Sequence, residues 1–301
     1  MTGGAGYVGS VLTVRLLGGG YQVRVVDSLV SYGGGPAPRF PAGTEFVRGD
    51  VRDFRLMTRA VDGCDAVVHL AAVVGYPACA ADPSEARSTN IDGTVTVLRA
   101  ASGRQVVFAS SMSCLGDVAG GICDEDVTPR PTSLYGVTKL TGERLVLDQP
   151  NTVVLRPATA FGLSPRMRMD LLVHQLVSDA VQTGAITLYE PGYVRCFGHV
   201  EDFASSIVHA ISRPDAMCGE IFHVGNGELN MTKRELAEAI SQIVPCDIAV
   251  AASGKDQDQR NYGATFSKLA GAGFSFKRGI DVGINEVLAF LNAEPSGLQR
   301  I

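Results

Sequence analysis

Several features that mark other classes of protein are absent from this sequence. It has no Trp, and it has no run of about 18 apolar residues that could cross a membrane as a helix. No basic leader followed by an apolar run stands at the N-terminus, so we expect a cytoplasmic protein with no membrane partner. The formal net charge of −5 argues against a non-specific partner in nucleic acid.

The cysteines form neither a disulfide framework nor a metal-binding pattern. The 7 Cys are odd in number, and no two of them form a C-x-x-C pair. We therefore expect no metal site, and cysteines that serve as small buried side chains in a reducing compartment.

Glycine, by contrast, is abundant. The chain has 35 Gly among 301 residues, above the usual share of about 7%. Hydrophobic residues at 46% and charged residues at 19% describe a globular protein. At about 150 residues per domain, the length suggests two lobes.

The first half of the chain alternates short apolar, β-branched runs with helix-length segments. Unbroken runs of this kind are typical of parallel strands that are covered on both faces. The expected strands are Gln22–Asp27, Thr44–Arg48, Ala66–Leu70, Gln105–Ser110 and Thr152–Arg156. The expected helices between them are Ser10–Leu17, Phe54–Val61, Ser84–Ala101 and Tyr135–Leu147. This order predicts an α/β fold with a doubly wound parallel sheet.

After Pro157 the regular alternation of short strands and helices ends. Helices are expected at Asp170–Val181, Val200–Ile211 and Thr232–Ile243, and strands at Ile186–Tyr189 and Glu220–Val224. We predict a cofactor domain over 1–157 and a smaller interleaved substrate lobe over 158–301, with segments near 200–226 returning to the first domain.

The chain opens on a glycine-rich loop, Thr2-Gly3-Gly4-Ala5-Gly6-Tyr7-Val8-Gly9. Its glycines at 3, 6 and 9 suit a tight turn, close approach of a pyrophosphate, and close helix packing in a Rossmann-type sheet. Asp27 ends the next strand, where a carboxylate meets the adenosine ribose and repels a 2′-phosphate. This pattern favours NAD over NADP.

The strand that should precede such a loop is missing from this sequence, because only Met1 stands before Thr2. We expect the first strand of the sheet to be reduced to a stub, and interpret this as a start assigned too far downstream.

A second pattern carries acid–base chemistry. Tyr135 and Lys139 stand four residues apart, on one face of a helix. A neighbouring ammonium favours the phenolate, which can take a proton from a hydroxyl. Ser110 and Ser111 end a strand at the edge of the sheet where ligands bind in such folds, and a serine there can hold the same substrate oxygen.

With these patterns in place, the sequence resembles the extended short-chain dehydrogenase/reductase family, in its nucleotide-sugar epimerase/dehydratase branch. The resemblance covers nearly the whole chain. It is carried by TGGAGYVG at 2–9, Asp27, GDVRD at 49–53, HLAA at 69–72, NIDGT at 90–94, FASS at 108–111, YGVTK at 135–139, LRPATAFG at 155–162, RCFGHVED at 195–202 and DQRNY at 258–262.

The resemblance implies roles for matching positions. Ser111, Tyr135 and Lys139 match the catalytic residues. The implied NAD contacts are Gly3, Gly6, Tyr7, Val8, Asp27, Asp50, Val51, Leu70, Ala71, Ala72, Asn90, Ser110, Tyr135 and Lys139. Asp50 and Val51 resemble the pair that flanks the adenine, whereas Asn90 resembles a helix asparagine whose role is more often structural.

The expected partner is a nucleotide-diphosphate sugar. Arg195 and Arg260 resemble arginines that grip the diphosphate, for which two guanidinium groups are suited. The further expected substrate contacts are Ser111, Met112, Ser113, Thr159 and His174. By the same resemblance we expect a homodimer formed through helices near 84–101 and 135–147.

Departures from the family pattern narrow the reaction. In the family's 4,6-dehydratases an Asp-Glu pair follows the catalytic Ser or Thr, but here Met112 and Ser113 stand there. The family's 3,5-epimerases carry a Cys two residues after the catalytic Ser. Here Ser113 stands at that position, and the nearest cysteine, Cys114, comes one residue later. Thr159 replaces a frequent Asn, and Leu115 replaces a usual Tyr. We therefore expect an NAD-dependent 4-epimerase acting through a transient 4-keto sugar. The alternatives are a 4-ketoreductase or dehydrogenase, and a catalytically silent NAD-binding sensor.

Overall fold

The computed structural model describes residues 1–32, 38–116, 118, 121–254 and 260–293, so Asp258 and Gln259 of the last motif lie outside the described residues. The chain divides into two compact units. Unit 1 comprises residues 1–116, 129–156 and 204–222, and unit 2 comprises residues 117–128, 157–203 and 223–301.

Unit 1 is built on parallel strands, as the apolar runs predict. One group of strands has the order β10-β6-β4-β3, and β1 pairs in parallel with β2. The bounds are β1 Val23–Asp27, β2 Thr44–Arg48, β3 Ala66–His69, β4 Gln105–Ala109, β6 Thr152–Pro157 and β10 Ile221–Val224.

The start of the chain joins these two groups of strands. Thr2 forms parallel bridges to Val26 on β1 and to His69 on β3. Its N–H donates to the Val68 carbonyl at 2.9 Å, and the Gly3 N–H donates to the Val26 carbonyl at 2.9 Å. Two residues therefore occupy the central strand position, as the sequence predicts, and the doubly wound sheet is continuous across them.

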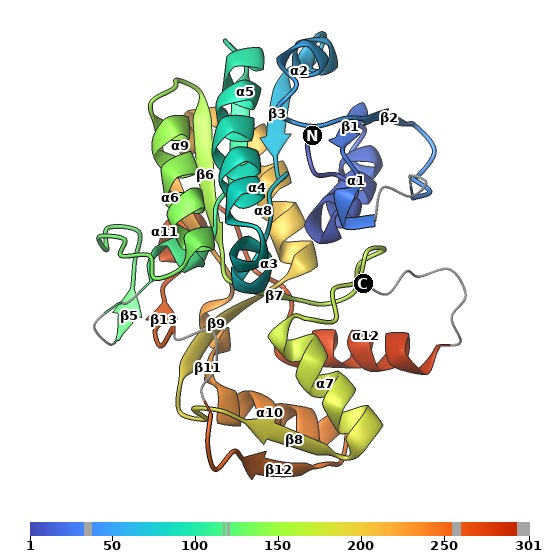
Figure 1. Cartoon of the computed structure of the whole chain (residues 1–301), viewed down its shortest axis with the longest axis vertical. Coiled ribbons are helices and arrows are strands. Elements are labelled where there is room, and N and C mark those ends of the chain that lie inside the picture. The colour runs from blue at the N-terminus through green and yellow to red at the C-terminus, as the bar shows by residue number, and fades with distance from the viewer. Residues whose placement is uncertain (33–37, 117, 119–120, 255–259, 294–301) are drawn as a thin grey trace. The chain divides into compact units, whose positions relative to one another are not determined.

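Helices cover this sheet. They are α1 Tyr7–Gly18, α2 Phe54–Val61, α3 Tyr76–Ala81, α4 Pro83–Arg87, α5 Gly93–Ala100, α6 Leu134–Leu147, α8 Val200–Ser212 and α9 Pro214–Met217. Val97 of α5 and Val146 of α6 pack into apolar clusters with strand residues such as Val106 and Val154. Figure 1 shows α5 and α6 side by side against the sheet.

The helix expected over Ser84–Ala101 is interrupted. A π-helical turn, η2 Ser88–Asp92, separates α4 from α5, and the buried Asn90 lies within it. The 3₁₀ turns are η1 Val30–Tyr32, η3 Met112–Cys114 and η4 Gly227–Leu229.

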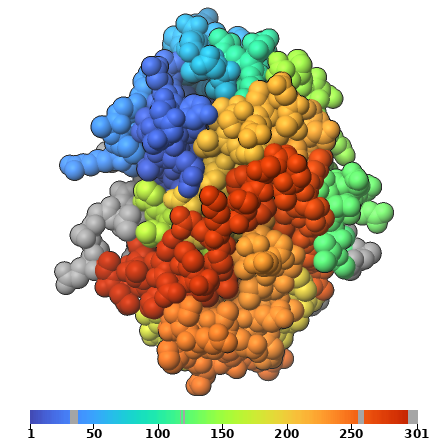
Figure 2. All heavy atoms as spheres, turned by 180° about the vertical axis from the view of Figure 1, so that it is seen from behind, coloured from blue at the N-terminus to red at the C-terminus, as the bar shows by residue number. Residues whose placement is uncertain are grey.

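Unit 2 contains three small sheets, with strand orders β11-β9-β7, β12-β8 and β13-β5. Its strands are β5 Ile122–Cys123, β7 Thr159–Phe161, β8 Ala185–Leu188, β9 Val194–His199, β11 Asn230–Thr232, β12 Asp247–Val250 and β13 Gly263–Ala264. Its helices are α7 Leu172–Thr183, α10 Lys233–Ile243, α11 Ser267–Gly271 and α12 Ile280–Asn292. On the face seen in Figure 2, its surface is formed mainly by C-terminal residues, coloured orange to red.

The start of α10 illustrates how sequence sets a boundary in unit 2. The Thr232 hydroxyl accepts from the Glu235 N–H at 3.1 Å, and the Glu235 carboxylate accepts from the Thr232 N–H at 2.7 Å. This reciprocal capping box fixes the first turn at the predicted position. No helix formed by the described residues has the length and apolar character needed to cross a membrane.

Candidate active site

The glycine loop of unit 1 forms a cradle that side chains would fill. Gly3 has a φ of +70°, and a Cβ there would lie 2.6 Å from the Ala71 backbone nitrogen. A Cβ at Gly9 would lie 2.4 Å from the Gly3 carbonyl oxygen, so α1 packs directly on the loop. Gly6 caps α1 without a side-chain bond, which leaves the first turn of the helix suited to a phosphate. The loop therefore fits the diphosphate of a dinucleotide.

Asp27 stands beside this loop at the end of β1. Its carboxylate accepts from the Ala5 N–H at 3.0 Å and from the Leu29 N–H at 2.9 Å. These bonds fix the carboxylate next to the glycine loop, where the sequence pattern predicts a contact with the adenosine ribose.

The segment after β3 lies on the opposite side of the loop. The Leu70 N–H donates to the Thr2 carbonyl at 3.2 Å, and the Ala71 N–H donates to the Thr2 hydroxyl at 3.4 Å. Thus the structure brings together the glycine loop, Asp27, Leu70 and Ala71, an arrangement that a dinucleotide site requires.

Asp50 and Val51 follow β2. Arg52 donates to both carboxylate oxygens of Asp50, and this hydrogen bonding lowers the pKa of Asp50. Arg52 also pairs with Glu85 at 2.7 Å. Val51 is buried in the apolar cluster under α2 and α5, so it shapes this end of the site by packing.

The catalytic residues expected from the sequence lie on neighbouring segments. Ser133 caps α6 through the Gly136 N–H, and Tyr135 and Lys139 are both buried on this helix. A Cβ at Gly136 would lie 2.5 Å from the Ser113 carbonyl oxygen, so α6 packs directly on η3. Ser111 begins that turn, and its hydroxyl oxygen accepts from the Ser113 N–H at 3.1 Å. The close approach at Gly136 brings the Ser111 segment to the helix of Tyr135 and Lys139.

Lys139 has an unusual environment for an ammonium group. Its Nζ lies 4.6 Å from the centre of the Phe108 ring, a favourable cation–π arrangement. Burial lowers the pKa of Lys139 to about 8, against the opposing effect of Glu143.

A buried ion pair stands behind these residues. Arg156 on β6 donates to Glu143 on α6 through Nε at 2.9 Å and through Nη2 at 2.8 Å. The Ser110 hydroxyl and the Cys114 thiol also donate to Glu143. Sequence reasoning did not identify this cluster, although Glu143 falls one helical turn after Lys139 on the same buried face.

Three expected contacts have other roles in the structure. Asn90 bonds through its amide to both backbone groups of Val73 and to the Thr138 hydroxyl, so it ties the loop after β3 to α6. Ser110 directs its hydroxyl to Glu143 instead of outward. The Met112 side chain is fully buried, so it presents no exposed side-chain atom to a substrate.

Cys114 is also fully buried, with its thiol 3.3 Å from the Glu143 carboxylate. Burial and this carboxylate raise the pKa of the Cys114 thiol. A protonated, enclosed thiol cannot act on a substrate carbon, which agrees with its displacement from the 3,5-epimerase position.

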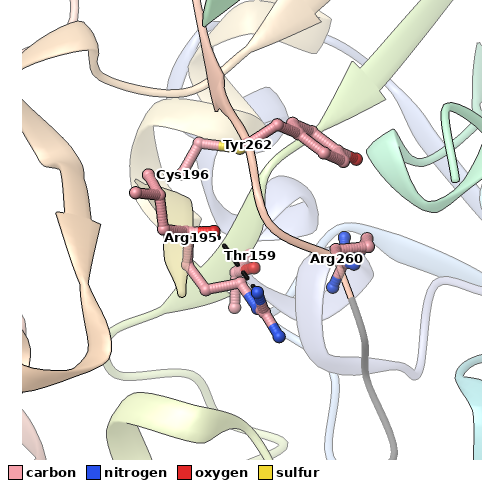
Figure 3. Close-up of a pocket in the computed structure, with 6 residues that line it drawn as sticks. Thr159, Arg195, Cys196, Arg260 and Tyr262 are labelled. Carbon is pink, nitrogen blue, oxygen red and sulfur yellow. Dashed lines mark hydrogen bonds between the residues drawn. The ribbon is translucent and has the colours of Figure 1, made fainter. Parts of the chain in front are cut away.

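Unit 2 contains a shallow, partly open pocket lined by Thr159, Val194, Arg195, Cys196, Arg260 and Tyr262. Figure 3 shows Thr159, Arg195 and Arg260 gathered at this pocket. Arg195 comes from β9 and Thr159 from the adjacent β7, which pairs in parallel with β9. The two arginines expected from the sequence therefore share one pocket. Cys196 and Tyr262 also line it; both lie in motifs that carry the family resemblance, but neither was expected as a contact.

His174 does not join that pocket. It is fully buried on α7, where Nε2 accepts from the Gly162 N–H at 3.0 Å. Nδ1 therefore carries the proton and donates to the Arg168 carbonyl at 2.8 Å. Burial lowers the pKa of His174 to about 4. With both ring nitrogens bound to backbone groups and the ring fully buried, His174 positions the loop before α7 and exposes no ring atom to a substrate.

Comparison with known proteins places these features in a family. A family model described as "NAD dependent epimerase/dehydratase family" matches residues 1–225. The chain is 29% identical over 266 residues to the UDP-glucose 4-epimerase of Streptomyces lividans, covering 81% of this chain and 80% of that protein. It is 30% identical over 259 residues to the dTDP-glucose 4,6-dehydratase of Streptomyces niveus, covering 80% and 75%.

A solved structure of a related enzyme has the same fold. The UDP-glucose 4-epimerase of Thermus thermophilus, in complex with NAD, superposes with a TM-score of 0.83 at 27% identity, covering 97% of this chain and 98% of that chain. The chain therefore belongs to the NAD dependent epimerase/dehydratase family, the nucleotide-sugar branch of the extended short-chain dehydrogenases/reductases, and is an NAD-dependent enzyme.

Proposed function

We propose that this enzyme is a nucleotide-sugar 4-epimerase that acts through a transient 4-keto sugar. The observation that carries the proposal is the arrangement at the start of α6. Tyr135 and Lys139 lie on a helix that packs on the turn after Ser111, while the Met112 side chain is buried. The site thus retains the groups for proton transfer at a hydroxyl, without the acid–base pair that the family's dehydratases use.

Unit 1 would hold the cofactor. The backbone of the glycine loop and the start of α1 would bind the diphosphate, and Asp27 would bind the adenosine ribose. Bound NAD supplies a hydride acceptor that can return the hydride to the same carbon.

Side chains of the protein itself would carry out the proton transfer. Tyr135 would take the proton of the sugar 4-hydroxyl through its phenolate oxygen and later return it. The Lys139 ammonium, buried beside the same helix face, would favour that phenolate and bind the nicotinamide ribose. Ser111 would donate a hydrogen bond to the reacting oxygen.

Unit 2 would supply substrate recognition. Arg195 and Arg260 line one pocket, and two guanidinium groups suit the paired charges of a nucleoside diphosphate. The proposed substrate is therefore a nucleotide-diphosphate sugar, the class to which the UDP-glucose and dTDP-glucose of its relatives belong. A homodimer formed through α4–α5 and α6, measurable by sedimentation, is part of the proposal.

The test is turnover of a panel of UDP-, dTDP-, GDP- and CDP-sugars, followed by proton NMR for the 4-epimer. We expect equilibration of the two epimers without added NAD, and no rise in absorbance at 340 nm. Stoichiometric NADH would instead identify a dehydrogenase, and consumption of a 4-keto sugar with NADH would identify a ketoreductase.

Tyr135→Phe separates an enzyme from a silent binding protein. The variant removes the proton-transferring oxygen, so we expect a loss of turnover by a factor of about 10² to 10⁴ with retention of bound NAD. Tyr21→Phe, at an exposed tyrosine of the same unit, is the matched control. Unchanged turnover in Tyr135→Phe would contradict the proposed role.

A further inference from the structure

Glu143 is a buried carboxylate whose position on α6 relates it to the proposed catalytic residues. It lies one helical turn after Lys139 and two turns after Tyr135, and its side chain is 2% exposed. A carboxylate this deeply buried requires compensation by charge and hydrogen bonds. The bidentate pair with Arg156 provides part of that compensation.

The remaining donors to Glu143 come from both sides of Ser111. Ser110 precedes it and donates its hydroxyl to Oε1 of Glu143. Cys114 follows it by three residues and donates its thiol to the same oxygen at 3.3 Å. One carboxylate oxygen therefore ties both ends of the Ser111 turn to the helix that carries Tyr135 and Lys139.

Glu143 also determines the charge around the Lys139 ammonium. The titratable groups that act on Lys139 are Glu143 on α6, Cys79 on α3 and Cys114 on η3, and Lys139 in turn acts on His69 of β3. Burial raises the pKa of both thiols, which keeps them neutral at physiological pH.

Arg156 on β6 is the cation that partly offsets the charge of Glu143. Glu143 is the carboxylate among these groups, and it opposes the lowering of the Lys139 pKa that burial causes.

We propose that Glu143 is a positioning residue of the active site, whose carboxylate clamps the Ser111 turn to α6 and places a negative charge one helical turn from the Lys139 ammonium. This inference rests on the proposed function for Ser111, Tyr135 and Lys139. It assigns Glu143 no direct contact with substrate or cofactor.

The primary test is Glu143→Gln, which preserves size and removes the charge. We expect kcat to fall by about 10-fold or more, with KM within about 2-fold and the NAD content unchanged. The alkaline limb of the kcat–pH profile should move to lower pH by about one unit, because Lys139 loses its facing carboxylate. A merely structural role would lower the Tm without moving that limb. Glu238→Gln, at an exposed glutamate of α10, is the matched control.

A second variant tests the clamp without disturbing the ion pair. Ser110→Ala combined with Cys114→Ala removes both donors that flank Ser111 and leaves Arg156 bound to Glu143. We expect a several-fold lower kcat with the alkaline limb unchanged, because the charge near Lys139 remains. If Glu143→Gln fails to fold, this double variant decides the question alone.

The outcomes are separable. Wild-type kcat and alkaline limb in Glu143→Gln, or wild-type kcat in the double variant, would overturn the positioning role. All rates are measured with a nucleotide sugar that the wild-type enzyme epimerises. A wild-type enzyme that epimerises none rejects the proposed function, whereas normal turnover in both variants rejects this inference alone.

Discussion

Acid should destabilise unit 1 through His69, the residue that ends β3. Its Nε2 lies 3.0 Å from the Thr94 hydroxyl, which donates its own proton to the Asn90 carbonyl at 2.7 Å. Nε2 therefore carries the ring proton, and Nδ1 accepts from the Thr2 hydroxyl at 2.7 Å. The neutral ring is fully buried and both of its nitrogens are bonded, so a second proton, on Nδ1, would break the bond to the Thr2 hydroxyl.

The size of the effect follows from the pKa. Burial, with a further contribution from Lys139, lowers the pKa of His69 from 6.5 to about 3. Below pH 6.5 the unfolded chain binds a proton that the folded chain excludes, so the stability present above that pH is lost as the pH falls. One full proton corresponds to about 1.4 kcal/mol per pH unit, which amounts to about 2.7 kcal/mol between pH 8 and pH 4.5. That is a large part of a total stability of about 5–15 kcal/mol.

The assay is equilibrium unfolding in guanidinium chloride, followed by circular dichroism at pH values from 8 to 4.5. His69→Asn keeps an acceptor near the Thr2 hydroxyl and removes the titrating ring. We expect its free energy of unfolding to be lower at pH 8 by about 1–3 kcal/mol. We also expect the free energy of unfolding of the variant to depend less steeply on pH than that of the wild type, with a slope that corresponds to about one proton fewer taken up on unfolding. His209→Asn on α8 is the control for the substitution itself. Equal slopes in wild type and His69→Asn would refute the reasoning.

Three further predictions concern function. Gly9→Ala should weaken NAD binding, measured by calorimetry, at least about 10-fold, because the added methyl group would lie 2.4 Å from the Gly3 carbonyl oxygen. The control is Gly18→Ala, whose methyl group would enter open space, and we expect it to bind NAD normally. Turnover should decline as the pH rises through about 8, where Lys139 loses its proton, and a rate that stays constant to pH 10 would contradict this. Arg195→Lys should raise KM for the nucleotide sugar about 10-fold with a smaller change in kcat, because a lysine cannot donate the paired bonds of a guanidinium.

The parts of the fold that sequence could predict depend on local patterns. Apolar β-branched runs indicated the strands of the parallel sheet to within a residue or two, and the Thr232–Glu235 box located the start of α10. The glycine loop was predictable because its spacing is dictated by the backbone alone. Each of these features is complete within about ten residues, so no tertiary information was needed.

Features that depend on distant partners were not predictable. The π turn at Ser88–Asp92 places Asn90 where it can bond Val73 and Thr138, and nothing in the local sequence indicates that break. The donors to Glu143 come from two segments, residues 110–114 and Arg156 on β6, so its role emerges only when the sheet and α6 are packed together. Residue type alone likewise could not show that His174 faces backbone groups instead of a ligand.

The burial of Met112 bears on how reactions diverge within this family. The proposed distinction between epimerase and dehydratase lies in the residues after Ser111, and not in Tyr135 or Lys139. In this chain the Met112 side chain is fully enclosed, so a carboxylate at that position would lose its hydration and cost several kcal/mol unless a new partner were built for it. A single substitution at Met112 therefore should not convert the enzyme to water elimination, because the turn that follows Ser111 would first have to be repacked so that this side chain faces the substrate.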